Sequence, residues 1–333
     1  MKSERILTAA IVALLLCGVI GVQSGALRLG WVTSAVLRLS ASLEVPPLDD
    51  PAMVRRGAAH YEIVCAGCHS SPLAPNRADH LRLTPPAPKL SLRRDDWLPE
   101  VLFLTVKHGI PNTAMPAWPA KGRDDEIWSI VAFLMVLPDL DAASYRARAG
   151  LDAEAAARPG PGAICARCHG VAGRGDATGA FPRLDIQSAE YLWLSLHAYR
   201  NGQRQSGFMA GIAGAMDAAK MARLAAHFAA GPADHPPSTP PSVVTEGDMA
   251  RRLPACTACH GPPDPARPAF PRLAGQSADY LALQLRLFAQ NPFTRGGGPF
   301  VGLMRAAAHN LSGADIQAAA QWYGKPLKTD PAD

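Results

Sequence analysis

A five-residue pattern, Cys-x-x-Cys-His, occurs three times in the 333 residues of this chain. Successive copies begin 100 and 91 residues apart. The copies consist of Cys65, Cys68 and His69; Cys165, Cys168 and His169; and Cys256, Cys259 and His260. They use six of the seven cysteines, and the seventh, Cys17, lies in an apolar segment where we interpret it as one more apolar residue. No cysteine pair is therefore left over for a disulfide.

The spacing within this pattern suits the covalent attachment of haem. Residues i, i+3 and i+4 share one face of a helical turn. Two thiols on that face can form thioethers with the two vinyl groups of one porphyrin, while the adjacent histidine ligates the iron. A zinc module is the alternative, but zinc sites need four ligands, commonly from two paired knuckles, and each pattern here stands alone. We therefore predict three covalently bound haem c groups.

A methionine downstream of the first pattern could complete an iron site. Met115 lies in the segment Asn-Thr-Ala-Met-Pro-Ala-Trp, 46 residues after His69. With these features the chain resembles the class I cytochromes c from residue 46 to its C-terminus. The resemblance implies small all-α domains, in which one helix runs into Cys-x-x-Cys-His, a C-terminal helix crosses it, and a methionine on the loop between them is the sixth iron ligand. We assign Met115 to that position, with His108 as its rival.

The fold class that we predict is all-α, with three tandem class I cytochrome c domains behind an N-terminal transmembrane or signal segment. In the first domain, an amphipathic stretch at 124–137 predicts a helix with Asp124 as its N-cap. We expect Trp128 on this helix to pack against Gly57 and Tyr61 of the first helix.

The second and third domains form an internal repeat. The sequence Phe-Pro-Arg-Leu at 181–184 recurs at 270–273, and Gln-Ser-Ala at 187–189 recurs at 276–278. This arrangement is similar to that of the dihaem cytochrome c4 family. The first domain lacks the Phe-Pro-Arg-Leu block and has His-Ser-Ser at 69–71 where the other two have His-Gly, so we place it in a different subgroup.

The resemblance to cytochrome c4 implies the sixth ligands of these two domains. In that family the methionine lies seven residues before the first apolar residue of the last helix. Met209 precedes Met216 by seven residues, and Met304 precedes Leu311 by seven. Met216 and Met221 are alternatives in the second domain, although their spacing also fits a core stripe of a helix. Further candidate ligands are His197 and His309.

A proline two residues before a leucine follows each haem pattern, at Pro88, Pro182 and Pro271. The resemblance implies that each proline carbonyl accepts the proton on the second ring nitrogen of the axial histidine, which fixes the ring plane. An ordinary loop proline is the alternative. Arg183 and Arg272 either pair with haem propionates or are solvated.

The domains that we predict are an N-terminal membrane anchor or signal with a tether at 1–45 and three cytochrome c domains at 46–148, 149–232 and 244–333. A proline-rich stretch at 231–241 predicts a stiff linker. Because a Pro-Gly-Pro-Gly run at 159–162 precedes Cys165, the first helix of the second domain must be short or broken. The last helix should start near Ser312 and finish by Gly324.

Residues 6–27 contain no charged side chain and are long enough to cross a bilayer. Basic residues precede them, so the rest of the chain would lie on the periplasmic side of the bacterial inner membrane. A cleaved signal peptide is the alternative. Either reading places the folded domains outside the cytoplasm, with 6–27 as the expected anchor.

The formal charge is +5, and no dense run of lysine and arginine supports nucleic-acid binding. An iron with histidine and methionine ligands is closed to substrate, which favours electron transfer. We predict an electron carrier without enzymatic activity of its own. By resemblance it is similar to the three-haem cytochrome subunit of membrane-bound dehydrogenases, and its partners would be a dehydrogenase, a quinol-oxidising complex or a terminal oxidase. A peroxidase-type haem enzyme with one open iron, and a structural or sensing module, are the alternatives.

Overall fold

The computed structural model of the protein describes residues 43–75, 83–92, 97–151, 162–176, 178–229, 231, 239–261, 268–290, 295 and 300–324. Within these residues the chain is helical, and its β pairing amounts to two isolated bridges, Ser71–Ala74 and Asp248–Leu253. The predicted all-α fold is confirmed. The expected anchor at 6–27 and most of the expected linker lie outside the described residues. Among those described, no helix combines the length and apolar character needed to span a membrane.

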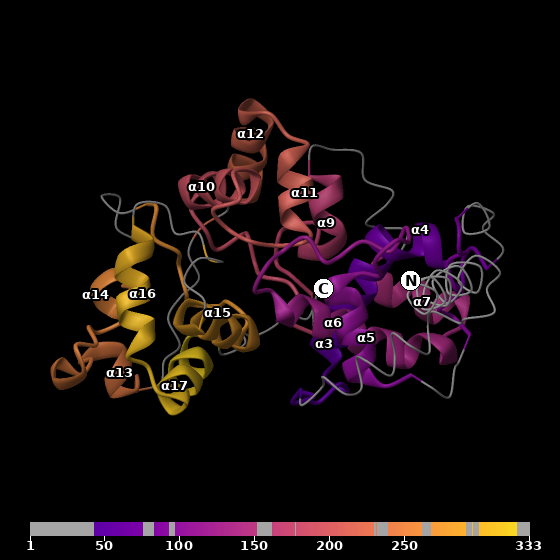
Figure 1. Ribbon diagram of the computed structural model, residues 1–333. Coiled ribbons are helices and arrows are strands. Elements are labelled where there is room, and N and C mark those ends of the chain that lie inside the picture. The colour runs from indigo at the N-terminus through magenta and orange to yellow at the C-terminus, as the bar shows by residue number, and fades with distance from the viewer. Residues whose placement is uncertain are drawn as a thin grey trace, which may run out of the picture.

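The helices gather into three groups that follow chain order (Figure 1). In the first group, one continuous helical run ends at the first haem pattern, because the α-helices α3 and α4 are joined through the π-helix η1. Asp50 caps this run by accepting a hydrogen bond from the backbone N–H of Ala52 at 2.9 Å. The elements of this group are α3 (Pro51–His60), η1 (Tyr61–Cys65), α4 (Ala66–His69), α5 (Pro99–His108), α6 (Asp124–Val136), the 3₁₀ helix η3 (Leu137–Asp139) and α7 (Ala142–Ala149).

Helices α3 and α6 cross at Gly57. A Cβ atom at this position would lie 1.8 Å from the carbonyl oxygen of Ser129, so the close approach needs glycine. The packing expected for Trp128 is wrong, because its ring stacks on Phe103 with 4.3 Å between centroids. Phe133 takes the expected place, with its Cβ beside Gly57 and its ring 5.4 Å from that of Tyr61.

The ends of the predicted helices are placed to within one residue. Helix α6 begins at Asp124 with Arg123 as its N-cap, one residue before the expected cap. The last helix, α17, has Ser312 as N-cap and Gly324 as C-cap, as predicted. The helix that carries the second haem pattern begins at Ala163, so the prediction of a short helix there is confirmed.

The second and third groups share one design. The second contains α9 (Ala163–His169), α10 (Ala189–Arg200), α11 (Met209–Gly214) and α12 (Ala218–Phe228). The third contains α13 (Ser242–Thr245), the 3₁₀ helix η4 (Met249–Arg251), α14 (Thr257–His260), α15 (Ala278–Gln290), α16 (Val301–His309) and α17 (Gly313–Tyr323). Helices α10 and α15 begin 89 residues apart, which is also the spacing of the repeated sequence blocks.

The repeated blocks form the contact between the second and third groups. The Gln187 side chain donates to the carbonyl oxygen of Arg272 at 2.8 Å and accepts from its N–H at 2.9 Å. The Gln276 side chain makes the same two bonds with the backbone of Arg183, at 3.0 and 2.9 Å. Equivalent residues thus exchange equivalent bonds, which is the pattern of a two-fold interface. The repeated sequence blocks therefore coincide with the interface between the second and third groups.

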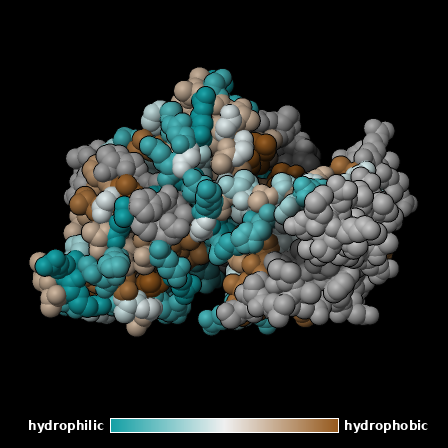
Figure 2. Space-filling model, in the orientation of Figure 1, coloured by the Kyte–Doolittle hydropathy of each residue, from teal (hydrophilic) through white to brown (hydrophobic). Residues whose placement is uncertain are grey.

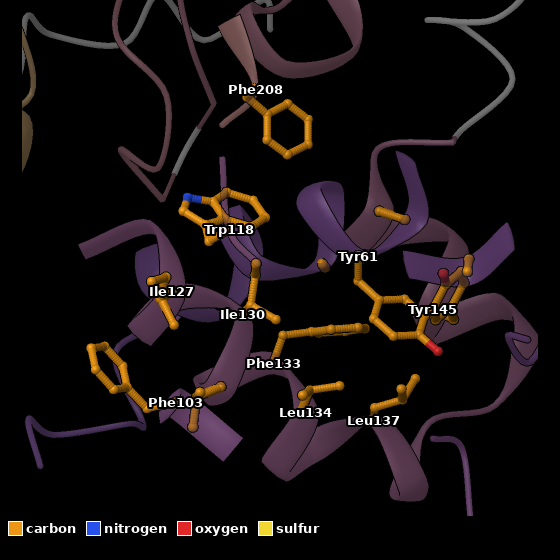
Figure 3. Close-up of a cluster of buried hydrophobic side chains, with 14 of the residues drawn as sticks. Tyr61, Phe103, Trp118, Ile127, Ile130, Phe133, Leu134, Leu137, Tyr145 and Phe208 are labelled. Atoms are coloured by element: carbon orange, nitrogen blue, oxygen red, sulfur yellow. The ribbon is translucent and has the colours of Figure 1, made fainter. Parts of the chain in front are cut away.

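The second group also packs against the first. Phe208 belongs to the first group's hydrophobic core, where it approaches Trp118 from above in Figure 3. A second small cluster joins Ala52 and Ala59 of α3 to Ala180 and Phe181. On the face shown in Figure 2, hydrophobic side chains occur in several separate areas among hydrophilic ones, so that face does not single out one surface for a partner.

Candidate functional site

The three pattern histidines share one kind of hydrogen-bond acceptor. The Nδ1 atom lies 2.9 Å from the carbonyl oxygen of Pro88 in His69, 2.8 Å from that of Pro182 in His169, and 2.9 Å from that of Pro271 in His260. A carbonyl oxygen only accepts, so Nδ1 carries the proton and Nε2 is left bare for a metal. The prediction that each proline carbonyl accepts from its histidine is confirmed.

Burial also suits these rings to metal ligation. It lowers the pKa of all three histidines, and the contact with the proline carbonyl only partly opposes this shift. The rings are therefore neutral at neutral pH, the state in which imidazole binds iron. The orientation of each histidine ring needs no side-chain partner, because a backbone carbonyl accepts the hydrogen bond from Nδ1.

The first cysteine of each pattern is a half-buried thiol, while Cys68 and Cys259 are exposed. Burial raises the pKa of Cys65 to about 12 and that of Cys165 and Cys256 to about 11. Moreover, no group of three or more histidine, cysteine, aspartate and glutamate side chains suited to a metal ion occurs in the part of the chain that the structure describes. The lack of further ligands beside each cysteine pair within these residues favours thioether attachment over the zinc alternative, because zinc sites need four ligands.

The methionines expected as sixth ligands occupy different settings. Met115 lies in the segment after α5, where its N–H bonds to Thr113 Oγ1 at 3.1 Å and its carbonyl accepts from Ile110 at 3.1 Å. Met209 begins α11 and Met304 lies inside α16, so these two stand on short helices rather than on the loop that the family resemblance implied. All three side chains are half-buried.

The rival ligands lie in less suitable places. Met216 and Met221 belong to a buried hydrophobic cluster of the second group, as expected for core residues. His108 and His309 are exposed at the ends of α5 and α16. His197 packs its ring against Trp193 on α10, with 4.5 Å between centroids.

Comparison with known proteins gives the family. A profile described as "Cytochrome C oxidase, cbb3-type, subunit III" matches residues 52–134. The "Thiosulfate dehydrogenase electron acceptor" of Thiomonas intermedia is 33% identical over 183 residues, which cover 52% of this chain and 83% of that protein. A "Cytochrome c4" of Pseudomonas aeruginosa is 33% identical over 183 residues, which cover 51% of this chain and 87% of that protein. This chain belongs to the cytochrome c4 family of class I c-type cytochromes.

Two buried arginines of this cytochrome fit the anionic propionates of haem. Arg204 and Arg295 are each 5% exposed, and the Nε of each has no hydrogen-bond partner. Arg204 donates to the hydroxyls of Tyr280, at 3.0 Å, and Ser195, at 3.2 Å. Among the described residues neither guanidinium forms an ion pair with a carboxylate. A buried cation in such surroundings is stabilised by an anionic ligand, so the donor set fits haem.

The two arginines that the sequence offered for propionate pairing or for solvation, Arg183 and Arg272, have protein partners instead. Arg183 makes a two-pronged pair with Asp185 and reaches the carbonyl oxygen of Gly275 across the interface at 3.4 Å. Arg272 donates to the carbonyl oxygen of Ile186 at 3.2 Å. No local motif marks Arg204, because one of its partners, Tyr280, lies 76 residues away in the sequence.

Proposed function

We propose that this cytochrome carries electrons through three haem c groups, one in each of the domains at 46–148, 149–232 and 244–333. The observation that supports this best is the threefold recurrence of a neutral, at least partly buried histidine whose Nδ1 is bound to a proline carbonyl. Electron transfer by a member of this family agrees with the names of its relatives, a cytochrome c4 and an electron acceptor. Bound haem iron supplies the chemistry, the gain and loss of single electrons.

The residues of the chain perform three tasks at each proposed site. The two cysteines would hold the porphyrin covalently. The histidine, oriented by the proline carbonyl, would offer Nε2 to the iron. The methionine would be the second protein ligand and would exclude small external ligands. The proposed ligand pairs are His69 with Met115, His169 with Met209, and His260 with Met304.

The proposed donor is a dehydrogenase or a quinol-oxidising complex, and the proposed acceptor is a terminal oxidase. The dehydrogenase is favoured because two relatives bear the name "Thiosulfate dehydrogenase electron acceptor". We place the protein on the periplasmic side of the inner membrane, attached through residues 6–27. This placement depends on the uncharged sequence of that segment alone.

Carbon monoxide tests the proposed function. A reduced iron with both axial positions filled by protein should bind carbon monoxide slowly or not at all. We expect this behaviour at all three haems, together with rapid reoxidation by membranes that contain a terminal oxidase. Rapid stoichiometric binding at one haem, with measurable peroxidase turnover, would replace the electron carrier with a peroxidase-type enzyme.

A further inference from the structure

We propose that Glu126 of the first domain is a positioning residue for the second haem site, because it holds the segment that presents Met209. This inference depends on the ligand assignment proposed above. It concerns a contact between the first domain and the second, outside the repeated blocks that join the second domain to the third.

Glu126 is an acidic side chain sealed inside the protein. It is 2% exposed and lies in the first turn of α6. Its Oε1 accepts from Ser206 Oγ at 2.6 Å and lies 3.0 Å from Arg123 Nη1. Its Oε2 accepts from the N–H of Gly207 at 2.8 Å and from Trp118 Nε1 at 3.1 Å. Each of these four groups donates to a carboxylate oxygen of Glu126, and a buried carboxylate needs such donors.

Ser206 links Glu126 to the backbone of the segment at 206–209, which carries Met209. Its hydroxyl donates to Glu126, and its oxygen accepts from the N–H groups of Phe208 at 3.2 Å and Met209 at 3.1 Å. Those N–H groups stand at the start of α11, where no helical carbonyl is available to them. Two successive hydrogen bonds therefore connect the carboxylate of the first domain to the backbone of Met209.

The same carboxylate also touches the ligand segment of its own domain. Trp118 follows Met115 by three residues and donates directly to Glu126. Packing strengthens the link, because the ring of Phe208 stacks on His60 with 3.8 Å between centroids. A Cβ atom on Gly207 would lie 2.3 Å from the Trp118 ring, so the two segments lie in direct contact. Charge-assisted hydrogen bonds at such a junction are stronger than neutral ones.

The competing explanation is that Glu126 only stabilises the interface between the first and second domains. Arg55 offers the matched comparison, because it also crosses from the first domain to the second. Its Nε pairs with Asp176 at 3.2 Å and its Nη2 donates to the carbonyl oxygen of Arg167 at 3.3 Å. Neither partner belongs to the segment at 206–209, whereas Arg167 lies within the second haem pattern, so Arg55 contacts the cysteine and histidine side of the same site. Loosening the interface through Arg55 should therefore leave Met209 held.

The experiment measures imidazole binding to the ferric holo-protein, because imidazole competes with methionine for the iron. The variants are Glu126→Asp, which keeps the charge but shortens the reach; Ser206→Ala, which changes no charge; Met209→Ala; and Arg55→Gln. We expect Glu126→Asp and Ser206→Ala each to raise the imidazole affinity of one haem about tenfold, as the loss of a charge-assisted hydrogen bond implies. The double variant should exceed the stronger single variant by less than about twofold. Arg55→Gln should stay within about twofold of the wild type.

Two outcomes overturn the proposal, and they are distinguishable. If Met209→Ala opens one haem to imidazole while Glu126→Asp and Ser206→Ala do not, Met209 is a ligand and Glu126 does not position it. If Met209→Ala leaves imidazole binding unchanged at every haem, the ligand assignment itself is wrong. If Glu126→Asp fails to fold, Ser206→Ala still decides the matter, because it removes only one hydroxyl from the second domain.

Discussion

At each pattern histidine, one ring nitrogen is committed to a backbone carbonyl at 2.8–2.9 Å. The consequence is a ring held in one tautomer and one plane without a second titratable side chain. Because the acceptor is a carbonyl, its strength does not change with pH, and the site keeps the same ligand geometry over a wide pH range. The identity of the sixth ligand then decides whether such an iron is closed.

The methionine assignments predict a graded loss of one spectroscopic signal. Each of Met115→Ala, Met209→Ala and Met304→Ala should remove about one third of the methionine–ferric charge-transfer band, because each site contributes one methionine. Absorption spectra of the oxidised variants measure this loss. Met216→Ala is the matched control, since its side chain lies in a hydrophobic cluster and should leave the band intact. Loss of the band in Met216→Ala but not in Met209→Ala would contradict the assignment.

Asp315 predicts an acid-dependent contribution to the stability of the third domain. The hydrogen bond from Arg251 and those from Ser312 lower the pKa of Asp315 to about 2. A carboxyl whose folded pKa lies below its unfolded value of about 3.9 stabilises the fold above that unfolded value, and this stabilisation is lost as pH falls through about 2. Asp315→Asn should therefore lower the free energy of unfolding at neutral pH by about 1 kcal/mol, mainly through the weakened cap of α17.

Guanidinium unfolding between pH 2 and 7, followed by circular dichroism, measures this difference between Asp315→Asn and the wild type. The difference should shrink toward pH 2. Asp279→Asn, an exposed change in the first turn of α15, is the control and should alter the free energy of unfolding by less than about 0.5 kcal/mol. A difference that stays constant with pH would show that the charge of Asp315 plays no part.

The site residues that could be predicted are those set by local spacing. Within each site, the cysteines, the histidine and the proline acceptor lie within about twenty residues of one another, so a short motif marks them. Glu126 and Arg204 could not be found in this way. Their roles come from Ser206 and Tyr280 in neighbouring domains, and a sequence does not reveal which distant segments meet.

At the scale of elements, the crossing of α3 and α6 determines the shape of the first domain. Helix limits followed from caps and breakers, which is why α17 could be placed from Ser312 and Gly324. Which neighbouring residue each helix side chain would contact was harder to predict. Trp128 and Phe133 both lie on α6, and periodicity alone did not show that Phe133 would meet Tyr61 while Trp128 turned to Phe103.

The crossing predicts a sharp contrast between two glycines. Gly57→Ala would place a methyl group 1.8 Å from the carbonyl oxygen of Ser129, so the helices must separate, at a cost of about 3 kcal/mol in the free energy of unfolding. Gly67→Ala is the control. A Cβ there meets nothing within 4 Å, and the third haem pattern carries alanine at the equivalent position, Ala258. Denaturant unfolding measures both, and equal stability of the two variants would contradict the packing described.

At the scale of the whole molecule, the three domains meet in two different ways. The second and third exchange equivalent hydrogen bonds through Gln187 and Gln276, as the repeated sequence allows. The first joins the second through unrelated residues, including Glu126 and Arg55. The sequence repeat indicates the symmetric contact between the second and third domains. The asymmetric contact between the first and second domains could not be predicted in this way, because its two sides share no motif.

Intact mass spectrometry combined with a pyridine haemochrome assay counts the haems attached to one chain. After expression with the complete haem-attachment machinery, we expect three covalently bound haems per chain. The double variant Cys256→Ser/Cys259→Ser should carry two, because it removes both thioether positions of one pattern. Two or fewer haems on the wild-type chain would contradict the account.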